Sequence, residues 1–235
     1  MTPFFLQHTP ERHGRRYVQL TETMSSPSEY DIRPLHQDDY DRVLYLLTHS
    51  FFVDEPILRG LQVTNTFDFS NDVINGCLKD QCSFVAYDKQ SKEIAGICLN
   101  ERERRGQVID APKYDEKINF VIELLDHLQD ETTIFDRLNV DTVLHIYIIN
   151  VDQSARGHGL ASRLISKSIE HAKNINLGGA FAEATNVYSL NCFKQQHFDI
   201  LYELKYTDCN PERLASMTDP HYDRCYLVGR QLQPR

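Results

Sequence analysis

The chain has 235 residues, which suits one globular domain with an extension or, at most, two small domains. Hydrophobic residues make up 41 % of it, enough for a substantial core, and 34 acidic against 25 basic residues give a formal net charge of -9. This balance disfavours nucleic acid as the main partner and favours a small cation.

The cysteine pattern and the hydropathy exclude further classes of protein. The six cysteines form no C-x-x-C pair and no zinc-like cluster with histidine. No apolar run approaches the roughly 20 residues of a membrane span, and the first arginines follow the short apolar patch instead of preceding it as in a secretory signal. We therefore expect a cytoplasmic monomer with reduced thiols, no metal, and neither a membrane nor a nucleic-acid partner.

Residues 1–28 are polar and include a Ser-Ser-Pro-Ser stretch, so we expect a flexible extension ahead of one domain over residues 29–235. Residue spacing then predicts strands at 30–34, 82–88, 94–100, 143–151, 179–184, 198–205 and 224–232, with helices at 37–50, from 54, at 70–78, 113–140, 159–173 and 187–196. The charged run 101–105 is expected to be a solvated strand end or loop. The alternation after residue 140 predicts an α/β sheet with helices on both faces.

The turn after the most apolar strand has the composition of an anion site. It reads Arg156-Gly157-His158-Gly159-Leu160-Ala161, between the strand that ends at Val151 and the next helix. Two glycines and a small alanine let the backbone approach a ligand, and N–H groups at a helix start favour phosphate. The P-loop sequence G-K-[ST] is absent, and a dinucleotide site would need G-x-G-x-x-G near an early strand. The alternative is a tight turn whose glycines serve only packing.

A second informative stretch is Phe51-Phe52-Val53-Asp54-Glu55-Pro56. Two aromatic residues followed by two carboxylates can line an apolar pocket for an aromatic amine and bind its cationic head. Burial beside apolar surface raises the pKa of a carboxyl, which suits a general base near neutrality. The alternative is an acidic pair that caps a helix.

Other residues near these stretches have two interpretations each. Thr185 and Ser189 can supply hydroxyls to the reaction, or serve as a helix cap and a solvated side chain. Tyr147 and Tyr188 can line the amine pocket or pack in the core. His145, on the central strand, can be a base or a core histidine with satisfied nitrogens, and we favour the core histidine.

The Arg156–Ala161 loop resembles the acetyl-CoA signature of the GNAT acetyltransferase superfamily. The Asp54-Glu55-Pro56 stretch resembles insect-type arylalkylamine (dopamine) N-acetyltransferases, and the resemblance spans roughly residues 29–232. It implies a GNAT-like mixed, mostly antiparallel central sheet of about seven strands with helices on both faces. It also implies acetyl-CoA as co-substrate.

The resemblance assigns expected roles by position. Glu55 is the expected general base, assisted by Thr185 and Ser189. The expected amine site is Phe52, Asp54, Pro56, Tyr147 and Tyr188. The expected acetyl-CoA site is Ile149, Val151, Arg156, Gly157, His158, Gly159, Leu160, Ala161, Ser162 and Asn186.

The sequence departs from the family pattern at two positions, 185 and 197, and it lacks a tyrosine that many other GNAT enzymes have. Phe193 stands where many GNAT enzymes have a tyrosine acid, a tyrosine that the arylalkylamine group also lacks. Thr185 replaces the more usual serine, and His197 replaces a glycine.

The resemblance implies an N-acetyltransferase that moves acetyl onto an arylalkylamine such as dopamine, tyramine, tryptamine, serotonin or octopamine, by direct attack. The alternatives are an acetyltransferase for aliphatic amines such as agmatine and polyamines, and an inactive acyl-CoA-binding module.

Overall fold

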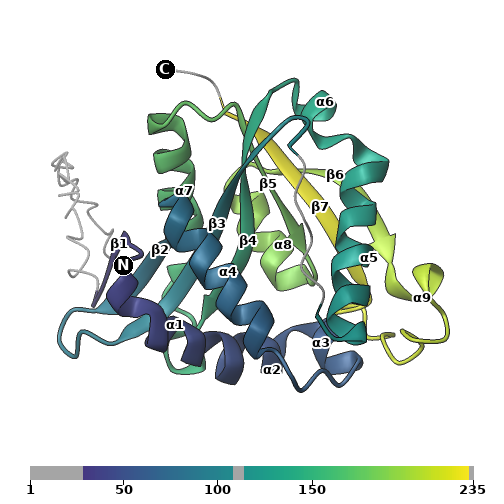
Figure 1. Ribbon diagram of the computed structural model, residues 1–235, viewed down its shortest axis with the longest axis horizontal. Coiled ribbons are helices and arrows are strands. Elements are labelled where there is room, and N and C mark those ends of the chain that lie inside the picture. The colour runs from purple at the N-terminus through teal and green to yellow at the C-terminus, as the bar shows by residue number, and fades with distance from the viewer. Residues whose placement is uncertain (1–28, 108–113, 233–235) are drawn as a thin grey trace, which may run out of the picture.

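A computed structural model describes residues 29–107 and 114–232, so the expected extension over residues 1–28 lies outside the described part. Its centre is a seven-stranded sheet in the order β1-β2-β3-β4-β5-β7-β6 (Figure 1). All neighbouring strands are antiparallel except the β4–β5 pair, which confirms the mixed, mostly antiparallel sheet. The strands are β1 (Tyr30–Pro34), β2 (Phe84–Asp88), β3 (Ile94–Arg104), β4 (Thr142–Val151), β5 (Gly179–Ala184), β6 (Asp199–Lys205) and β7 (Arg224–Gln231).

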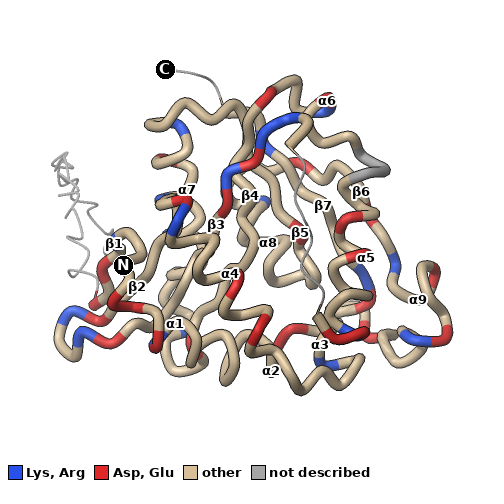
Figure 2. The backbone as a smooth tube through the Cα atoms, viewed as in Figure 1, with Lys and Arg blue, Asp and Glu red and all other residues tan. Residues whose placement is uncertain are grey.

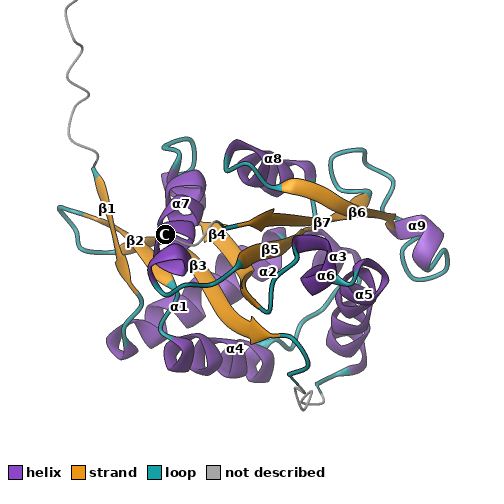
Figure 3. Ribbon diagram, turned by 90° about the horizontal axis from the view of Figure 1, so that it is seen from above, coloured by secondary structure: helices purple, strands orange, loops and turns teal. Residues whose placement is uncertain are grey.

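Helices cover both faces of this sheet (Figure 3). On one face lie α7 and α8, and on the other lie α1, α4 and α5. Each face of the sheet has its own buried apolar cluster. The helices are α1 (Tyr40–Leu46), α2 (Phe52–Asp54), α3 (Pro56–Gly60), α4 (Phe67–Asp80), α5 (Glu116–Thr132), α6 (Ile134–Leu138), α7 (Leu160–Asn174), α8 (Val187–Gln195) and α9 (Tyr206–Cys209).

The long helix α7 shows why the sheet faces are covered in this way. Leu164, Ile165, Ile169 and Ala172 recur at helical spacing, and all four are buried against β2, β3 and β4. Burying each large aliphatic side chain contributes about 1.5–3 kcal/mol. This packing fixes the start of α7, and therefore the loop before it, relative to the end of β4.

Strand β4 separates from β5 part-way along its length. The two strands pair only over Val143–His145, whereas β4 pairs with β3 along its full length. The β3–β4 register shifts so that Tyr147 is an extra residue of β4, between Ile146 and Ile148. A bulge of this kind bends the strand and redirects the side chains that follow it. The second half of β4 therefore borders an open wedge between β4 and β5.

The expectation of a single helix at 37–50 was wrong. This stretch is divided into a 3-10 turn, α1 and a π-helical turn at Leu47–Phe51, and π turns are frequent at functional sites. The run 101–105, expected to be a solvated strand end or loop, is the end of β3 and the first turn residue after it: its three arginines are exposed, while the carboxylate of Glu103 points to His145. Figure 2 shows the alternating charges at this end of β3.

Across the described residues, no helix is both long and apolar enough to span a bilayer. In the same part of the chain, no three His, Cys, Asp or Glu residues gather in a way that could hold a metal ion. All six cysteines are free thiols, and Cys77, Cys82 and Cys98 are buried as expected for core residues.

Candidate active site

A cavity of about 560 Å³ occupies the wedge between β4 and β5. Its walls come from the α2–α3 junction, α4, α5, β4, β5 and α8. Most lining side chains are apolar, and three are carboxylates: Asp54, Glu55 and Glu183. Concave, mostly apolar sites with a few converging polar groups are typical of small-molecule binding.

Glu55 lies at the α2–α3 junction, where the chain leaves the helical conformation for one residue (φ -65°, ψ 122°). It is the N-cap of α3: Leu58 N–H donates to its Oε2 at 2.7 Å, and Pro56 occupies the first turn. The capping interpretation of the acidic pair is therefore correct for Glu55. Capping uses only one carboxylate oxygen, however, and the side chain also lines the cavity.

The second oxygen of Glu55 gives the site its chemical character. Oε1 is buried and accepts no hydrogen bond of normal geometry among the described residues. Burial raises the pKa of Glu55, while the Leu58 N–H and the Thr185 hydroxyl act in the opposite direction. A buried, unpartnered carboxylate oxygen in a cavity can accept a proton from a ligand held there.

Asp54, the neighbouring carboxylate, has a different environment. Its side chain is half exposed and forms an ion pair with Arg156, which joins the α2–α3 junction to the loop after β4. Arg156 Nε also donates to the Val151 carbonyl at 3.0 Å. Asp54 is therefore already paired with a cation, whereas Glu55 has no such partner among the described residues.

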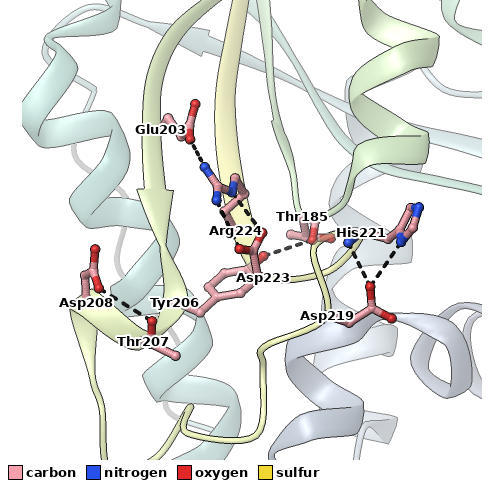
Figure 4. A network of polar contacts seen from close by, with 9 residues as sticks. All are labelled: Thr185, Glu203, Tyr206, Thr207, Asp208, Asp219, His221, Asp223 and Arg224. Atoms are coloured by element: carbon pink, nitrogen blue, oxygen red, sulfur yellow. Dashed lines mark hydrogen bonds and ion pairs between the residues drawn. The ribbon is translucent and has the colours of Figure 1, made fainter.

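Thr185 and Ser189 both line the cavity, at the end of β5 and in the first turn of α8. The helix cap is neither of them, because Asn186 Oδ1 accepts from the backbone N–H groups of Tyr188 and Ser189. Ser189 Oγ donates to the Asn186 carbonyl at 3.0 Å. The carbonyl of Thr185 accepts a hydrogen bond from Tyr206, a fully buried residue of α9 (Figure 4).

The loop before α7 presents unpaired backbone donors. Gly157 and Gly159 have φ values of 85° and 68°, a region that favours glycine, and nothing lies within 4 Å of an added Cβ at either position. Within the described residues, the N–H groups of 157–162 find no acceptor. Six such donors at the positive end of a 15-residue helix form a cradle that fits a pyrophosphate.

The expected cofactor residues take different positions around this cradle. Ile149, Val151, Arg156, Ala161 and Asn186 line the cavity. The remaining three side chains point elsewhere: the His158 ring packs against Tyr30, Leu160 is buried in the core, and Ser162 Oγ donates to Gln195. The buried Leu160 can therefore meet a ligand only through its backbone N–H group, whereas His158 and Ser162 are not buried.

Four of the five expected amine-site residues line the cavity, and Pro56 does not. Pro56 is the buried first residue of α3 and borders a smaller cavity of about 180 Å³. Phe52 and Tyr147 belong to an aromatic wall joined by Phe69, with ring centroids 5.9 and 6.2 Å from that ring. Tyr188 is 57 % exposed and stacks on His221 at the cavity entrance.

Sequence reasoning missed Glu183, whose side chain is 4 % exposed at the cavity wall. Its Oε1 accepts from Gln129 Nε2 at 2.9 Å, and its Oε2 lies 2.7 Å from His145 Nε2. Nδ1 of the same histidine lies 2.8 Å from Glu103 Oε1. The available signal was a single acidic residue in the otherwise apolar strand 179–184.

Both nitrogens of His145 are satisfied, as expected for a core histidine. Burial alone would lower the pKa of His145, but the charges of Glu183 and Glu103 raise it well above its ordinary value. The two carboxylates on either side of the ring therefore favour its protonated, positively charged form.

Comparison with known proteins agrees with this geometry. The model of the acetyltransferase (GNAT) family matches residues 62–198. The chain belongs to the GNAT family. It is a GNAT N-acetyltransferase. The matched region includes β4, β5 and the N–H groups of 157–162, whereas Glu55 precedes it.

Three solved GNAT structures illustrate the range of similar folds. Arylalkylamine N-acetyltransferase 2 from Aedes aegypti is 24 % identical with a TM-score of 0.79, over 87 % of this chain and 99 % of that one. An agmatine N-acetyltransferase mutant is 15 % identical with a TM-score of 0.74, over 87 % and 100 %. NAA60 of Arabidopsis thaliana in complex with acetyl-CoA is 16 % identical with a TM-score of 0.53, over 86 % and 99 %. At these identities the likeness establishes the fold alone.

Proposed function

We propose that residues 29–235 form the catalytic domain of an arylalkylamine N-acetyltransferase, which transfers acetyl from acetyl-CoA to a primary amine. The observation that carries this proposal is the position of Glu55. It is a buried carboxylate with one free oxygen, in an aromatic-walled cavity that borders a phosphate cradle.

The cofactor end of the cavity fits the coenzyme. When bound, acetyl-CoA supplies an electrophilic thioester carbonyl. We assign its pyrophosphate to the free N–H groups of 157–162 and to Arg156, and its pantetheine arm to the free edge of β4 near Ile149 and Val151. Packing of α7 holds these donors in place before the ligand arrives.

The amine end supplies the proton acceptor. In the proposed reaction the amine nitrogen attacks the carbonyl carbon, the N–C bond forms and the C–S bond breaks. Coenzyme A departs as the thiolate, and the proton that Glu55 takes from the amine is passed to its sulfur, which gives the thiol and restores the Glu55 carboxylate. Glu55 Oε1 accepts a proton from the amine, directly or through one water, and Thr185 and Ser189 orient the reacting groups. The raised pKa of Glu55 makes it a stronger base than an exposed glutamate.

The aromatic wall supports an arylalkylamine over an aliphatic amine. Phe52, Phe69 and Tyr147 offer ring faces and edges, and Ile118, Val121 and Leu125 of α5 complete an apolar surface. An aliphatic polyamine would leave much of this surface without a matching group.

The test is thiol release from acetyl-CoA with a panel of amines: dopamine, tyramine, tryptamine, agmatine and spermidine. We expect arylalkylamines to have the highest kcat/KM. Highest turnover of agmatine or spermidine would assign the protein to aliphatic amines, and tight coenzyme A binding without turnover of any amine would indicate a binding module.

A further inference from the structure

The cavity contains a carboxylate that the proposed chemistry does not use. Glu183 lies near the end of β5, two residues before Thr185, which directly follows the strand, and both side chains line the cavity. A buried carboxylate is costly unless fixed partners hold it, and here Gln129 and His145 do so. A satisfied charge facing a ligand cavity is a candidate recognition group.

Glu183 retains capacity for a further donor. A carboxylate has about four acceptor positions, and Gln129 and His145 occupy one on each oxygen. Because both partners are donors in fixed positions, the Glu183 side chain cannot easily turn to meet a misplaced group. The remaining acceptor positions therefore favour a donor at one place in the cavity.

The α5 wall leads towards this carboxylate. Ile118, Val121 and Leu125 line the cavity at helical spacing, and Gln129, one turn after Leu125, reaches Glu183. Phe69 of α4 faces the same space. A flat aromatic ring fits between such apolar surfaces with one edge turned to Glu183.

The distance along β5 matches the length of an arylalkylamine. Thr185 interacts with Glu55, at the place proposed for the amine. Two residues of a strand span about 7 Å, so Glu183 is displaced from Thr185 by about the span of an ethylamine chain and one ring. An amine nitrogen near Glu55 therefore places a ring substituent near Glu183.

We propose that Glu183 determines substrate specificity by accepting a hydrogen bond from a ring hydroxyl, so that the favoured substrates are phenolic arylalkylamines. The inference rests on the function proposed above. A second cation at this place would have to leave water for a site with mostly apolar walls, and a neutral hydroxyl makes the same contact at a lower desolvation cost.

The test compares four amines: tyramine, phenethylamine, 4-methoxyphenethylamine and agmatine. Phenethylamine lacks the hydroxyl, and the methoxy compound keeps the oxygen but cannot donate. Each is measured with the wild type, Glu183→Leu, and Glu123→Gln, a control that removes an exposed charge from α5 outside the cavity. Coenzyme A binding and a thermal melt report whether Glu183→Leu is folded.

In the wild type and in Glu123→Gln we expect tyramine to have a kcat/KM at least about tenfold above phenethylamine and 4-methoxyphenethylamine. In Glu183→Leu we expect tyramine to fall to the phenethylamine level, while phenethylamine changes by less than about threefold. If Glu183→Leu does not fold, Glu183→Met, which keeps the length of the side chain and removes the acceptor, takes its place with the same expected loss of the preference for tyramine.

Equal wild-type kcat/KM for tyramine and phenethylamine would overturn the inference. So would an equal loss of both in folded Glu183→Leu, or a loss confined to agmatine. Failure of the proposed function has a different signature, because then none of the three arylalkylamines is acetylated by the wild type, and the inference fails with it.

Discussion

The two ends of the cavity are built on different principles. The cofactor end is made of backbone: two glycines and the free N–H groups before α7, all within one loop of the sequence. The amine end is made of buried side chains, with Glu55, Thr185 and Glu183 drawn from two distant segments. The comparison teaches that a local motif is enough to build the anion cradle, whereas the proton acceptor depends on how the whole fold buries one carboxylate.

The largest effect should come from the amine end. We expect Glu55→Gln to lower kcat/KM by at least about a hundredfold, because it removes the proton acceptor while Gln can still cap α3. Affinity for coenzyme A should not change. Asp54→Asn is the matched control, since this neighbouring carboxylate is half exposed, and it should cost less than about fivefold. Equal losses in the two variants would contradict the proposed base.

The same substitution should stabilise the protein near neutral pH. Burial raises the pKa of Glu55 in the folded state, so folding is opposed once pH rises above the pKa of the unfolded chain. Gln carries no charge and avoids this cost. Thermal melts should show a higher Tm for Glu55→Gln at pH 7 and a smaller difference at pH 4, and a lower Tm at pH 7 would contradict the assigned burial effect.

At the cofactor end the expected effect is smaller and concerns binding. Gly159→Ala must hold φ near 68° with a side chain, at a cost of about 1–2 kcal/mol. We expect coenzyme A affinity to fall about tenfold in calorimetry. Gly106→Ala is the control: φ is 73°, an added Cβ meets nothing, and the residue lies in the turn after β3, so stability should fall without a change in affinity.

Thr185→Val tests the amine end of the cavity with a small change, because it replaces one hydroxyl by a methyl group of similar size. The Thr185 contact lowers the pKa of Glu55, so its loss should raise that pKa further. The lower limb of the kcat/KM profile should move to higher pH, with a loss of about threefold to tenfold at pH 7. Ser189→Ala should leave this limb in place, because Ser189 donates to the Asn186 carbonyl.

The smallest effect on rate should come from Tyr206→Phe. This removes the hydrogen bond to the Thr185 carbonyl and leaves that acceptor without its buried donor. We expect a loss of about 1–2 kcal/mol in urea unfolding and a rate change of less than about threefold. A large rate loss with unchanged stability would mean that Tyr206 acts on the chemistry itself.

The contrast between local and long-range features also explains which parts of the structure could be predicted from the sequence. Strand periodicity placed β1 and β5 at their observed bounds, and the glycine loop pointed to the turn with free N–H groups before α7, because both signals are local. The Tyr147 bulge and the π turn before Glu55 were not predicted, since both arise from packing between distant segments. Glu183 was missed because its partners, Gln129 and His145, lie far from it in the chain.

The most direct test of the central claim is the pH dependence of kcat/KM for tyramine in the wild type and in Glu55→Gln. We predict that the wild type loses activity below a pKa higher than that of an exposed glutamate, and that the residual activity of Glu55→Gln lacks this limb. An unchanged limb in Glu55→Gln, at a rate close to that of the wild type, would contradict the role of Glu55.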